Sequence, residues 1–202
     1  AKHGVLYVTE KIYPTELVTK KPIKTAADFD GLKLRSSGTL QIFLSSLGAA
    51  ASYLPGPELY PALSSGVVEG AHWGAAQGAD SMKLYDICKY HMKPPINLSG
   101  NDIWLFNQKA VDSLPEDLRQ ILLATLEEHF WKRSNEYLYL EAMALSKAKR
   151  DLGVEVVTVP PEEVKKLMEP AMKLWDEVAA KSDDCAKGVE MIRDFLKSMG
   201  RL

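Results

Sequence analysis

The chain has 202 residues, of which 46% are hydrophobic and 26% are charged, so we expect one large or two small domains with a buried core. The formal net charge of −2 gives no support for nucleic acid or an anionic membrane as a partner. No apolar run of about 18 residues predicts a transmembrane helix. The first residues carry neither a signal-peptide core nor a cleavage site, so we expect the chain to begin inside a fold.

The two cysteines, Cys88 and Cys185, lack the spacing of a metal site or a redox pair. The sequence therefore argues against zinc binding and thiol redox chemistry. Two free, buried thiols are favoured over a disulfide between them, although the sequence leaves both open.

Short β-branched and aromatic runs open the chain. Residues 5–9 (VLYVT) and 17–23 (LVTKKPI) are predicted to be extended, the second because the residue before Pro22 is pushed toward β conformation. Thr25 can cap a single helical turn, and the Asp-Gly pair after that turn leads into a strand at 32–35.

Strands and helices then alternate. The apolar spacing of residues 39–47 predicts a helix with Gly48 as its left-handed cap, and 51–54 predicts the next strand. Another helix follows a Pro-Gly-Pro turn and ends at Gly66, before a strand at 67–73. This alternation predicts a mostly parallel sheet covered by helices on both faces, in which ligands bind outside the carboxyl ends of the strands.

The second half of the chain is predicted to be mainly helical. Ser113 and Pro115 mark the start of a helix that no Gly or Pro interrupts before Gly153. Over 115–152 it would be about 57 Å long at about 1.5 Å per residue, longer than one small domain. The remaining predicted elements are a helix at 76–85, extended segments at 88–92, 102–107 and 154–159, and a polar hinge at 97–101. Two further helices are predicted, one opened by Pro160 and Pro161 and a last one that starts at Ser182 or Asp183 and runs through Met199.

Apolar residues of the long helix form two stripes. Leu118, Ile121 and Leu122 belong to the first, whereas Leu138 and Met143 belong to a second that does not continue the same face. We therefore expect each half of this helix to pack on a different body.

Three motifs together resemble one protein family. They are Gly31–Arg35 (GLKLR), then Glu58–Leu63 (ELYPAL) with Gly66–Gly70 (GVVEG), then Leu114–Asp117 (LPED) at the start of the long helix. In order and spacing they resemble the solute-binding proteins of TRAP transporters, the DctP family. The resemblance extends over essentially the whole chain, and the combination is more specific than any single motif.

This resemblance implies an α/β fold of the periplasmic-binding-protein type, with two lobes, mixed sheets flanked by helices and one long helix spanning both lobes. Family members carry a segment ahead of the point where this chain starts, so the first lobe would be partial. By comparison with the family, residues 13–98 and 140–202 would form the second, carboxylate-binding lobe, and 1–12 with 99–139 a fragment of the first.

The same resemblance implies a periplasmic protein that captures a small organic acid and delivers it to the membrane subunits of a TRAP permease. The branch it is most similar to binds 2-oxo acids and lactate, so a 2-oxo or 2-hydroxy monocarboxylate is expected. The alternative is a periplasmic sensing module that binds the same acids and signals to a receptor partner. The long helix and apolar positions such as Trp175 would be compatible with a homodimer in either case.

An enzyme is not expected, because the sequence has no GxSxG, HExxH, P-loop or GxGxxG motif. Arg35, at the carboxyl end of its predicted strand, matches the arginine that clamps the ligand carboxylate in the family. Arginine suits this role because its planar fork donates two parallel hydrogen bonds and stays charged. The alternative for Arg35 is a surface ion pair that contributes little stability.

His72 and Trp73 follow the next predicted strand. The 2-oxo acid branch resembles this chain at the tryptophan, but it has a glutamate that helps to hold a metal ion where this chain has His72. No cofactor is therefore expected, and a bound cation is disfavoured. Trp73 would form an apolar wall of the ligand site or be a core residue, and His72 would donate to a ligand oxygen or be purely structural.

Four polar residues complete the predicted site. The hydroxyls of Ser36 and Ser37 lie where the next helix begins, a position that favours anions, although both residue types also serve as turn and cap residues. Gln77 and Asn97 are the remaining candidates for contacts with the ligand.

Overall fold

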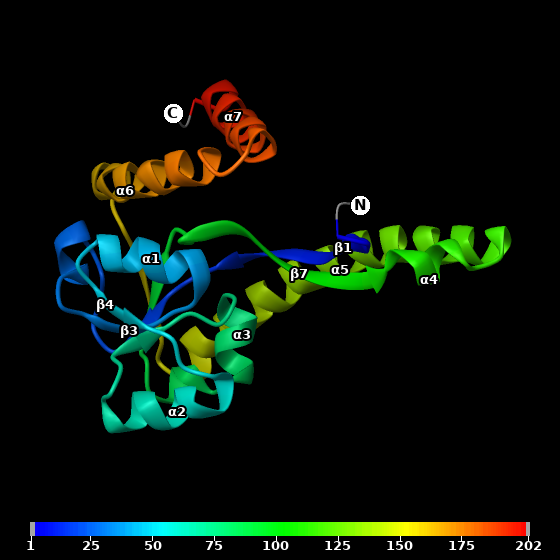
Figure 1. Cartoon of the computed structure of the whole chain (residues 1–202). Coiled ribbons are helices and arrows are strands. Elements are labelled where there is room, and N and C mark those ends of the chain that lie inside the picture. Colours follow the sequence, from blue (N-terminus) through cyan, green and yellow to red (C-terminus); the bar gives the residue numbers. More distant parts are fainter. Residues whose placement is uncertain (1–2, 201–202) are drawn as a thin grey trace. The chain divides into compact units, whose positions relative to one another are not determined.

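The computed structural model describes residues 3–200 (Figure 1). These residues divide into two compact units. The first unit contains the chain up to Pro22 together with Gly56–Thr158, and the second contains Ile23–Pro55 and the chain from Val159 onward. The lobe boundaries expected from the sequence follow a different division, and they stay a prediction.

A long antiparallel ribbon runs through the first unit. Its strands are β1 (Val5–Thr15) and β7 (Asn97–Asn107), which pair from Val5 opposite Asn107 to Thr15 opposite Asn97. The sequence predicted only the first half of β1 and placed a polar hinge at 97–101, where the structure has strand. The polar residues of β7 remain in the strand because they are partly or fully exposed and pair with β1 through their backbone.

The first unit also contains a mixed sheet, in the order β5, β2, β6, β8. Strand β2 is antiparallel to both β5 and β6, whereas β6 and β8 are parallel. The α/β class with mixed sheets is therefore confirmed. Strands β5, β6 and β8 share one direction and only β2 runs against them, so the sheet of this unit is mostly parallel, as the strand–helix alternation predicted. The elements are β2 (Val18–Thr19), α2 (Gly56–Ser65), β5 (Gly70–Ala71), α3 (Ala76–Ser81), η2 (Leu84–Asp86), β6 (Tyr90–Lys93), α4 (Gln108–Asp112), α5 (Glu116–Asp151) and β8 (Glu155–Thr158).

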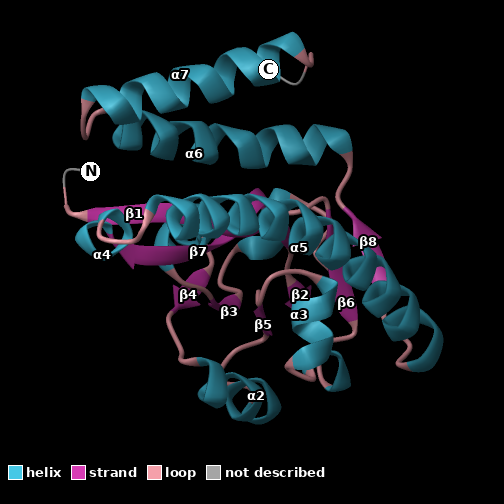
Figure 2. Cartoon of the chain, turned by 90° about the vertical axis from the view of Figure 1, so that its right-hand side faces the viewer, coloured by secondary structure: helices cyan, strands magenta, loops and turns pink. Residues whose placement is uncertain are grey.

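The second unit pairs strand β3 (Lys33–Arg35) in parallel with β4 (Ala50–Ser52). Its predicted helix starts are confirmed: Thr25 forms a capping box with Asp28, and the Ser182 side chain accepts a hydrogen bond from the N–H of Cys185 at 3.2 Å. Figure 2 shows the last two helices side by side. The helices of this unit are η1 (Ala26–Phe29), α1 (Gly38–Ser46), α6 (Pro161–Ala179) and α7 (Asp183–Ser198).

Helix α5 is unbroken, as predicted, but it does not bury the expected stripes. Leu118, Ile121, Leu138 and Met143 are exposed. The side chains that α5 buries are a polar and small-residue set: Ser134, Tyr137, Glu141, Ala144 and Ala148. No helix in the described part of the chain is long and apolar enough to cross a membrane.

Both cysteines are free thiols, with Cys88 buried and Cys185 partly exposed. Burial raises the pKa of Cys88 to about 12, so this thiol is unreactive at neutral pH. The expectation of free thiols is confirmed, and only the first of them is fully buried.

A buried acid, Glu16, lies between β1 and β2 and pairs with two residues of β6. Glu16 is 2% exposed and His91 is 0% exposed, and the His91 Nε2 atom forms a short hydrogen bond with the Glu16 carboxylate. Lys93 forms an ion pair with the same carboxylate, and the Tyr85 hydroxyl lies 2.7 Å from His91 Nδ1. Burial favours the neutral acid, but the hydrogen bonds from His91 and Lys93 outweigh it and hold the pKa of Glu16 below its usual value.

We predict that Glu16→Gln lowers the free energy of unfolding by about 3–5 kcal/mol at pH 7, because it leaves buried partners uncompensated. Glu136→Gln is the matched control: Glu136 is exposed and receives a hydrogen bond from Arg133 at 2.8 Å. It should change the free energy of unfolding by less than about 1 kcal/mol. Urea denaturation of both variants measures the difference.

The same pair of variants gives a pH test. Because the pKa of Glu16 is lower in the folded state, its contribution to stability is complete above about pH 5 and is lost as the pH falls through the folded-state pKa. The deficit of Glu16→Gln against wild type should therefore shrink in acid. A deficit that is equal at pH 7 and at about pH 3 would contradict an ionised Glu16 in the native state.

Helix α3 packs against the backbone of the preceding loop at Gly78. A Cβ atom built on Gly78 would lie 1.7 Å from the carbonyl oxygen of Trp73, far inside van der Waals contact. No side chain can be placed there unless α3 or the Trp73 backbone moves. Gly78 is therefore needed for close packing rather than for a left-handed conformation.

We predict that Gly78→Ala destabilises the protein by about 1–3 kcal/mol, because the clash is with backbone and cannot be relieved by a rotamer change. The control is Gly188→Ala in α7, where an added Cβ meets nothing within 4 Å. That variant should be neutral or more stable by up to about 1 kcal/mol, from higher helix propensity. Denaturation curves compare them, and equal stability of Gly78→Ala and wild type would refute the close packing.

Candidate functional site

Arg35 ends strand β3 in the second unit and is 5% exposed. Its Nε donates a hydrogen bond to the carbonyl oxygen of Leu54 at 3.0 Å, and its guanidinium carbon lies 5.8 Å from the centre of the Tyr53 ring. Burial lowers the pKa of Arg35 from its usual value, although an arginine remains ionised in proteins. Arg35 is thus a buried side chain whose Nε contacts the Leu54 carbonyl, and its role as a carboxylate clamp stays a prediction.

Ser36 and Ser37 connect β3 to α1. Ser36 is fully buried, and its N–H donates to the carbonyl oxygen of Ser52 at 2.9 Å, which extends the parallel pairing beyond Arg35. Ser37 is the N-cap residue of α1, but its side chain makes no capping hydrogen bond to that helix. The structure thus places both serines next to Arg35 in sequence and at the start of α1, where positive potential favours anions.

His72 and Trp73 follow β5 in the first unit. His72 is buried and Trp73 is partly exposed, so Trp73 is not a fully enclosed core residue. Its indole packs on the start of α2, because a Cβ on Gly56 would lie 2.7 Å from the Trp73 Cη2 atom. The carbonyl oxygen of Gly74 accepts a hydrogen bond from the Glu16 N–H at 2.9 Å, which ties this loop to β1.

Gln77 and Asn97 each form a hydrogen bond within the first unit. Gln77 lies in the first turn of α3, and its backbone N–H donates to Glu141 Oε2 at 3.0 Å. Asn97 begins β7, and its side-chain oxygen accepts from the N–H of Ser99 at 3.1 Å. Within the first unit, His72 and Trp73 lie in the loop between β5 and α3, and Gln77 lies in the first turn of α3. Asn97 lies apart from them in sequence, at the start of β7 in the antiparallel ribbon.

Sequence reasoning missed the residues that support this loop. Glu16, Tyr137 and Glu141 all lie beneath or beside it, and Tyr137 approaches so closely that a Cβ on Gly74 would lie 3.1 Å from its hydroxyl. A lone acid on a helix is indistinguishable in sequence from a solvated surface residue. No local signal could therefore have identified Glu141.

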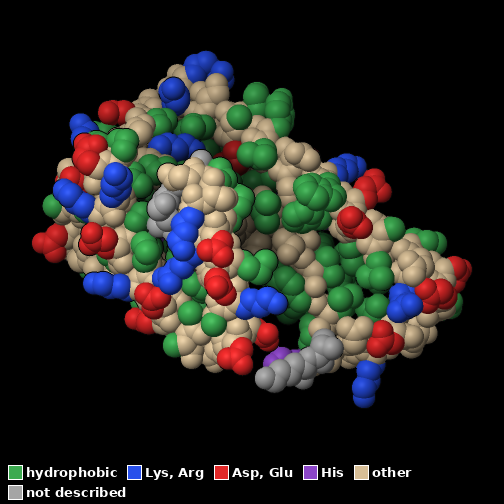
Figure 3. All heavy atoms as spheres, turned by 90° about the horizontal axis from the view of Figure 1, so that it is seen from above, with side chains coloured by type: hydrophobic (Ala, Val, Ile, Leu, Met, Phe, Trp, Pro, Cys, Tyr) green, Lys and Arg blue, Asp and Glu red, His purple; other side chains and the backbone are tan. Residues whose placement is uncertain are grey.

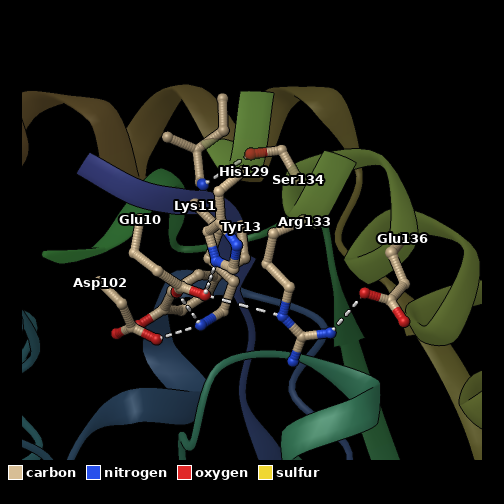
Figure 4. Close-up of polar contacts among 9 residues, drawn as sticks. Glu10, Lys11, Tyr13, Asp102, His129, Arg133, Ser134 and Glu136 are labelled. Carbon is tan, nitrogen blue, oxygen red and sulfur yellow. Dashed lines mark hydrogen bonds and ion pairs between the residues drawn. The ribbon is translucent and has the colours of Figure 1, made fainter. Parts of the chain in front are cut away.

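A second polar cluster lies between β1, β7 and α5 (Figure 4). Lys11 is paired with Asp102 and with Glu10, and the Tyr13 hydroxyl donates to Asp102 at 3.1 Å. Burial, reinforced by Asp102, raises the pKa of Tyr13 to about 12. Glu10 also lies 3.7 Å from Arg133 Nε and 3.3 Å from His129 Nε2, and Arg133 pairs with Glu136 as well. These contacts indicate a structural network that attaches α5 to the ribbon.

His72 does not suit a calcium or sodium ion as a ligand. These hard cations take oxygen ligands, mainly carboxylates and carbonyls, whereas this chain has an imidazole at His72. Among residues 3–200, no group of three or more His, Cys, Asp or Glu side chains is arranged to hold a metal. We therefore assign no metal-dependent step to this site.

Comparison with known proteins supports the resemblance seen in the sequence. The model of the family DctP, described as bacterial extracellular solute-binding protein, family 7, matches residues 15–182. A relative from Nostoc sp., named as a monocarboxylate 2-oxoacid-binding periplasmic protein, is 26% identical over 181 residues, which cover 89% of this chain and 50% of the relative. The chain thus spans about half the length of that relative.

Two solved structures share the fold. A TRAP periplasmic solute-binding protein from Colwellia psychrerythraea, with bound calcium and pyruvate, superposes with a TM-score of 0.87 at 23% identity over 98% of this chain and 61% of that one. A TRAP solute-binding protein from Bordetella bronchiseptica, a dimer with calcium and picolinate, gives a TM-score of 0.85 at 23% identity over 99% and 61%. By its family match over residues 15–182, this chain belongs to the DctP family of bacterial extracellular solute-binding proteins.

Proposed function

We propose that this chain is part of a periplasmic solute-binding protein that captures a small organic acid and delivers it to the membrane subunits of a TRAP transporter. Arg35 is the observation that carries the proposal, because a buried guanidinium held by the Leu54 carbonyl at the end of a strand is suited to a carboxylate. The expected ligand is a 2-oxo or 2-hydroxy monocarboxylate, in line with the name of the Nostoc relative.

The hydrogen bonds of Arg35 alone cannot supply the free energy of binding that micromolar affinity needs. A hydrogen bond to a charged group contributes about 1.5–3 kcal/mol, whereas micromolar affinity needs about 8 kcal/mol. We therefore assign Trp73 to the carbon skeleton of the acid and Ser36, Ser37, His72, Gln77 and Asn97 to its remaining oxygens. The remainder comes from burial of the ligand, because excluding water strengthens the ion pair.

The alternative, a sensing module for the same acids, differs only in its partner. Membership of a transport family favours delivery to a permease. A permease gene beside the coding sequence would support transport, whereas a neighbouring histidine kinase gene would support sensing. We assign no catalytic role to any residue.

We predict that pyruvate or a related acid stabilises the full-length protein in a thermal-shift screen of carboxylates. Ligand at 100 times its dissociation constant should add about 2.7 kcal/mol to the free energy of unfolding. Arg35→Lys should remove most of the shift, because lysine cannot donate two parallel hydrogen bonds. Arg150→Lys is the matched control, since Arg150 is exposed and paired only with its neighbour Asp151 at 2.7 Å in the described contacts.

Failure of every acid to shift the melting temperature would contradict the solute-binding function. An unchanged shift in Arg35→Lys would instead exclude Arg35 from the site while leaving the function standing. Equal losses in Arg35→Lys and Arg150→Lys would indicate a nonspecific effect of the substitution.

We further propose that the full-length protein forms a homodimer through α7. This helix carries an apolar face that is exposed in its unit, with Phe195 63% and Met191 65% exposed, and with Ile192 and Met199 beside them. Hydrophobic side chains also gather over β1, β7 and α5 (Figure 3), including Leu105 and Trp131. The α7 face is the better candidate for self-association because its four residues lie on one side of a single helix.

Sedimentation equilibrium of the full-length protein tests the dimer. We expect the wild type to be dimeric and Phe195→Asp to be monomeric at micromolar concentration, because a buried unpaired charge opposes association. Lys197→Gln, on the polar side of α7, should leave the mass unchanged. A monomeric wild type, or a dimer that tolerates Phe195→Asp, would refute this interface.

A further inference from the structure

Glu141 is a buried carboxylate to which the predicted ligand contacts assign no role. It lies in α5, is 8% exposed, and accepts a hydrogen bond from the Gln77 N–H through Oε2 at 3.0 Å. Its Oε1 is buried and makes no hydrogen bond of normal geometry within the described residues, although the Glu141 carboxylate interacts with the Tyr137 hydroxyl and, in addition to burial, helps to raise the pKa of Tyr137. A buried acid with an oxygen that lacks such a hydrogen bond destabilises a fold, so stability alone is a poor reason for this residue.

Glu141 supplies the cap that α3 lacks. The N-cap residue of α3 is Ala75, which has no side-chain acceptor, so the first N–H groups of this helix need partners from elsewhere. The Glu141 carboxylate accepts one of these N–H groups and places negative charge at the positive end of the helix. A second contact ties the same helices together, since Lys147 Nζ lies 3.0 Å from Asp80 Oδ2.

The start of α3 and Trp73 are mechanically coupled. Gly78 packs directly on the Trp73 carbonyl, and the Trp73 ring packs on Gly56. The next residue, Gly74, is held by the Glu16 N–H at 2.9 Å. A shift of the first turn of α3 would therefore move the Trp73 backbone, because this packing leaves no free space to absorb the shift.

The ionisation of Glu141 depends on whether the first turn of α3 is folded. Burial raises the pKa of Glu141, whereas the N–H groups of Gln77 and Ala76 lower it, and the nearby Glu16 and His91 act in opposite directions. The ionised carboxylate is thus stabilised by the ordered start of α3, and α3 is stabilised by the carboxylate.

We propose that Glu141 is a positioning residue for ligand binding: by holding the first turn of α3, it keeps the Trp73 indole where a 2-oxo acid needs it. The inference rests on the proposed function, because the place of Trp73 affects affinity only if the ligand lies against it. Glu141 itself touches no ligand in this proposal. It acts through Gln77, Gly78 and the Trp73 backbone.

The test uses the full-length protein with two substitutions of Glu141, read by amide hydrogen exchange and by pyruvate titration. Glu141→Leu removes the acceptor, so exchange in the peptide 72–79 should rise and pyruvate should bind at least about tenfold more weakly. Glu141→Gln keeps an oxygen acceptor and should restore both. Glu136→Gln, an exposed site on the same helix, is the control and should match wild type in both measurements.

Several results would overturn the inference. They are wild-type exchange of residues 72–79 in Glu141→Leu, faster exchange with unchanged pyruvate affinity, or a failure of Glu141→Gln to restore protection. Wild-type protein that does not bind pyruvate would instead contradict the expected ligand, and the exchange measurement would still decide whether Glu141 positions the loop.

A second variant covers the case in which Glu141→Leu does not fold. Gln77→Pro removes the same hydrogen bond from the donor side, and proline is tolerated in the first turn of a helix. Exchange at the amides of Trp73 to Ala76 should then rise as expected for Glu141→Leu. Protection equal to wild type would refute the coupling between this hydrogen bond and the loop.

Discussion

The first unit depends on one buried acid at the end of its long ribbon. The Glu16 carboxylate pairs with His91 and Lys93 on β6, and the N–H of the same residue holds the Gly74 carbonyl. A single residue thus joins β1, the mixed sheet and the loop that carries Trp73. A buried charge is tolerated here because hydrogen bonds compensate for the water it loses.

The loop from His72 to Gly78 is consequently fixed on several sides. Glu16 holds its backbone from β1, Glu141 holds the start of α3, and Gly56 lies against the indole of Trp73. Binding sites gain affinity when their groups are already in place, because less order is lost on association. Glu16 and Glu141 are far from this loop in the sequence, but their hydrogen bonds hold its backbone in place.

Local structure was predictable wherever the signal was local. The cap at Thr25, the cap at Ser182 and the unbroken α5 follow from residue types at fixed offsets, and the structure confirms each of them. The prediction from sequence failed at residues 97–101, where pairing between two distant strands determines the secondary structure. The polar residues at 97–101 resemble a turn in isolation, but pairing with β1 draws them into a strand, because the ladder satisfies their backbone groups at an exposed edge.

The sequence alone determined the family, the α/β class and the candidate clamp Arg35, because these depend on motifs and short-range spacing. Only the tertiary structure decided which face of α5 is buried, that β2 runs against its neighbours, and that Glu141 reaches the first turn of α3. The physical reason is that burial of a helix face and the partner of a buried charge are set by elements distant in the chain. An acid such as Glu141 therefore acquires its role only when α3 packs against α5.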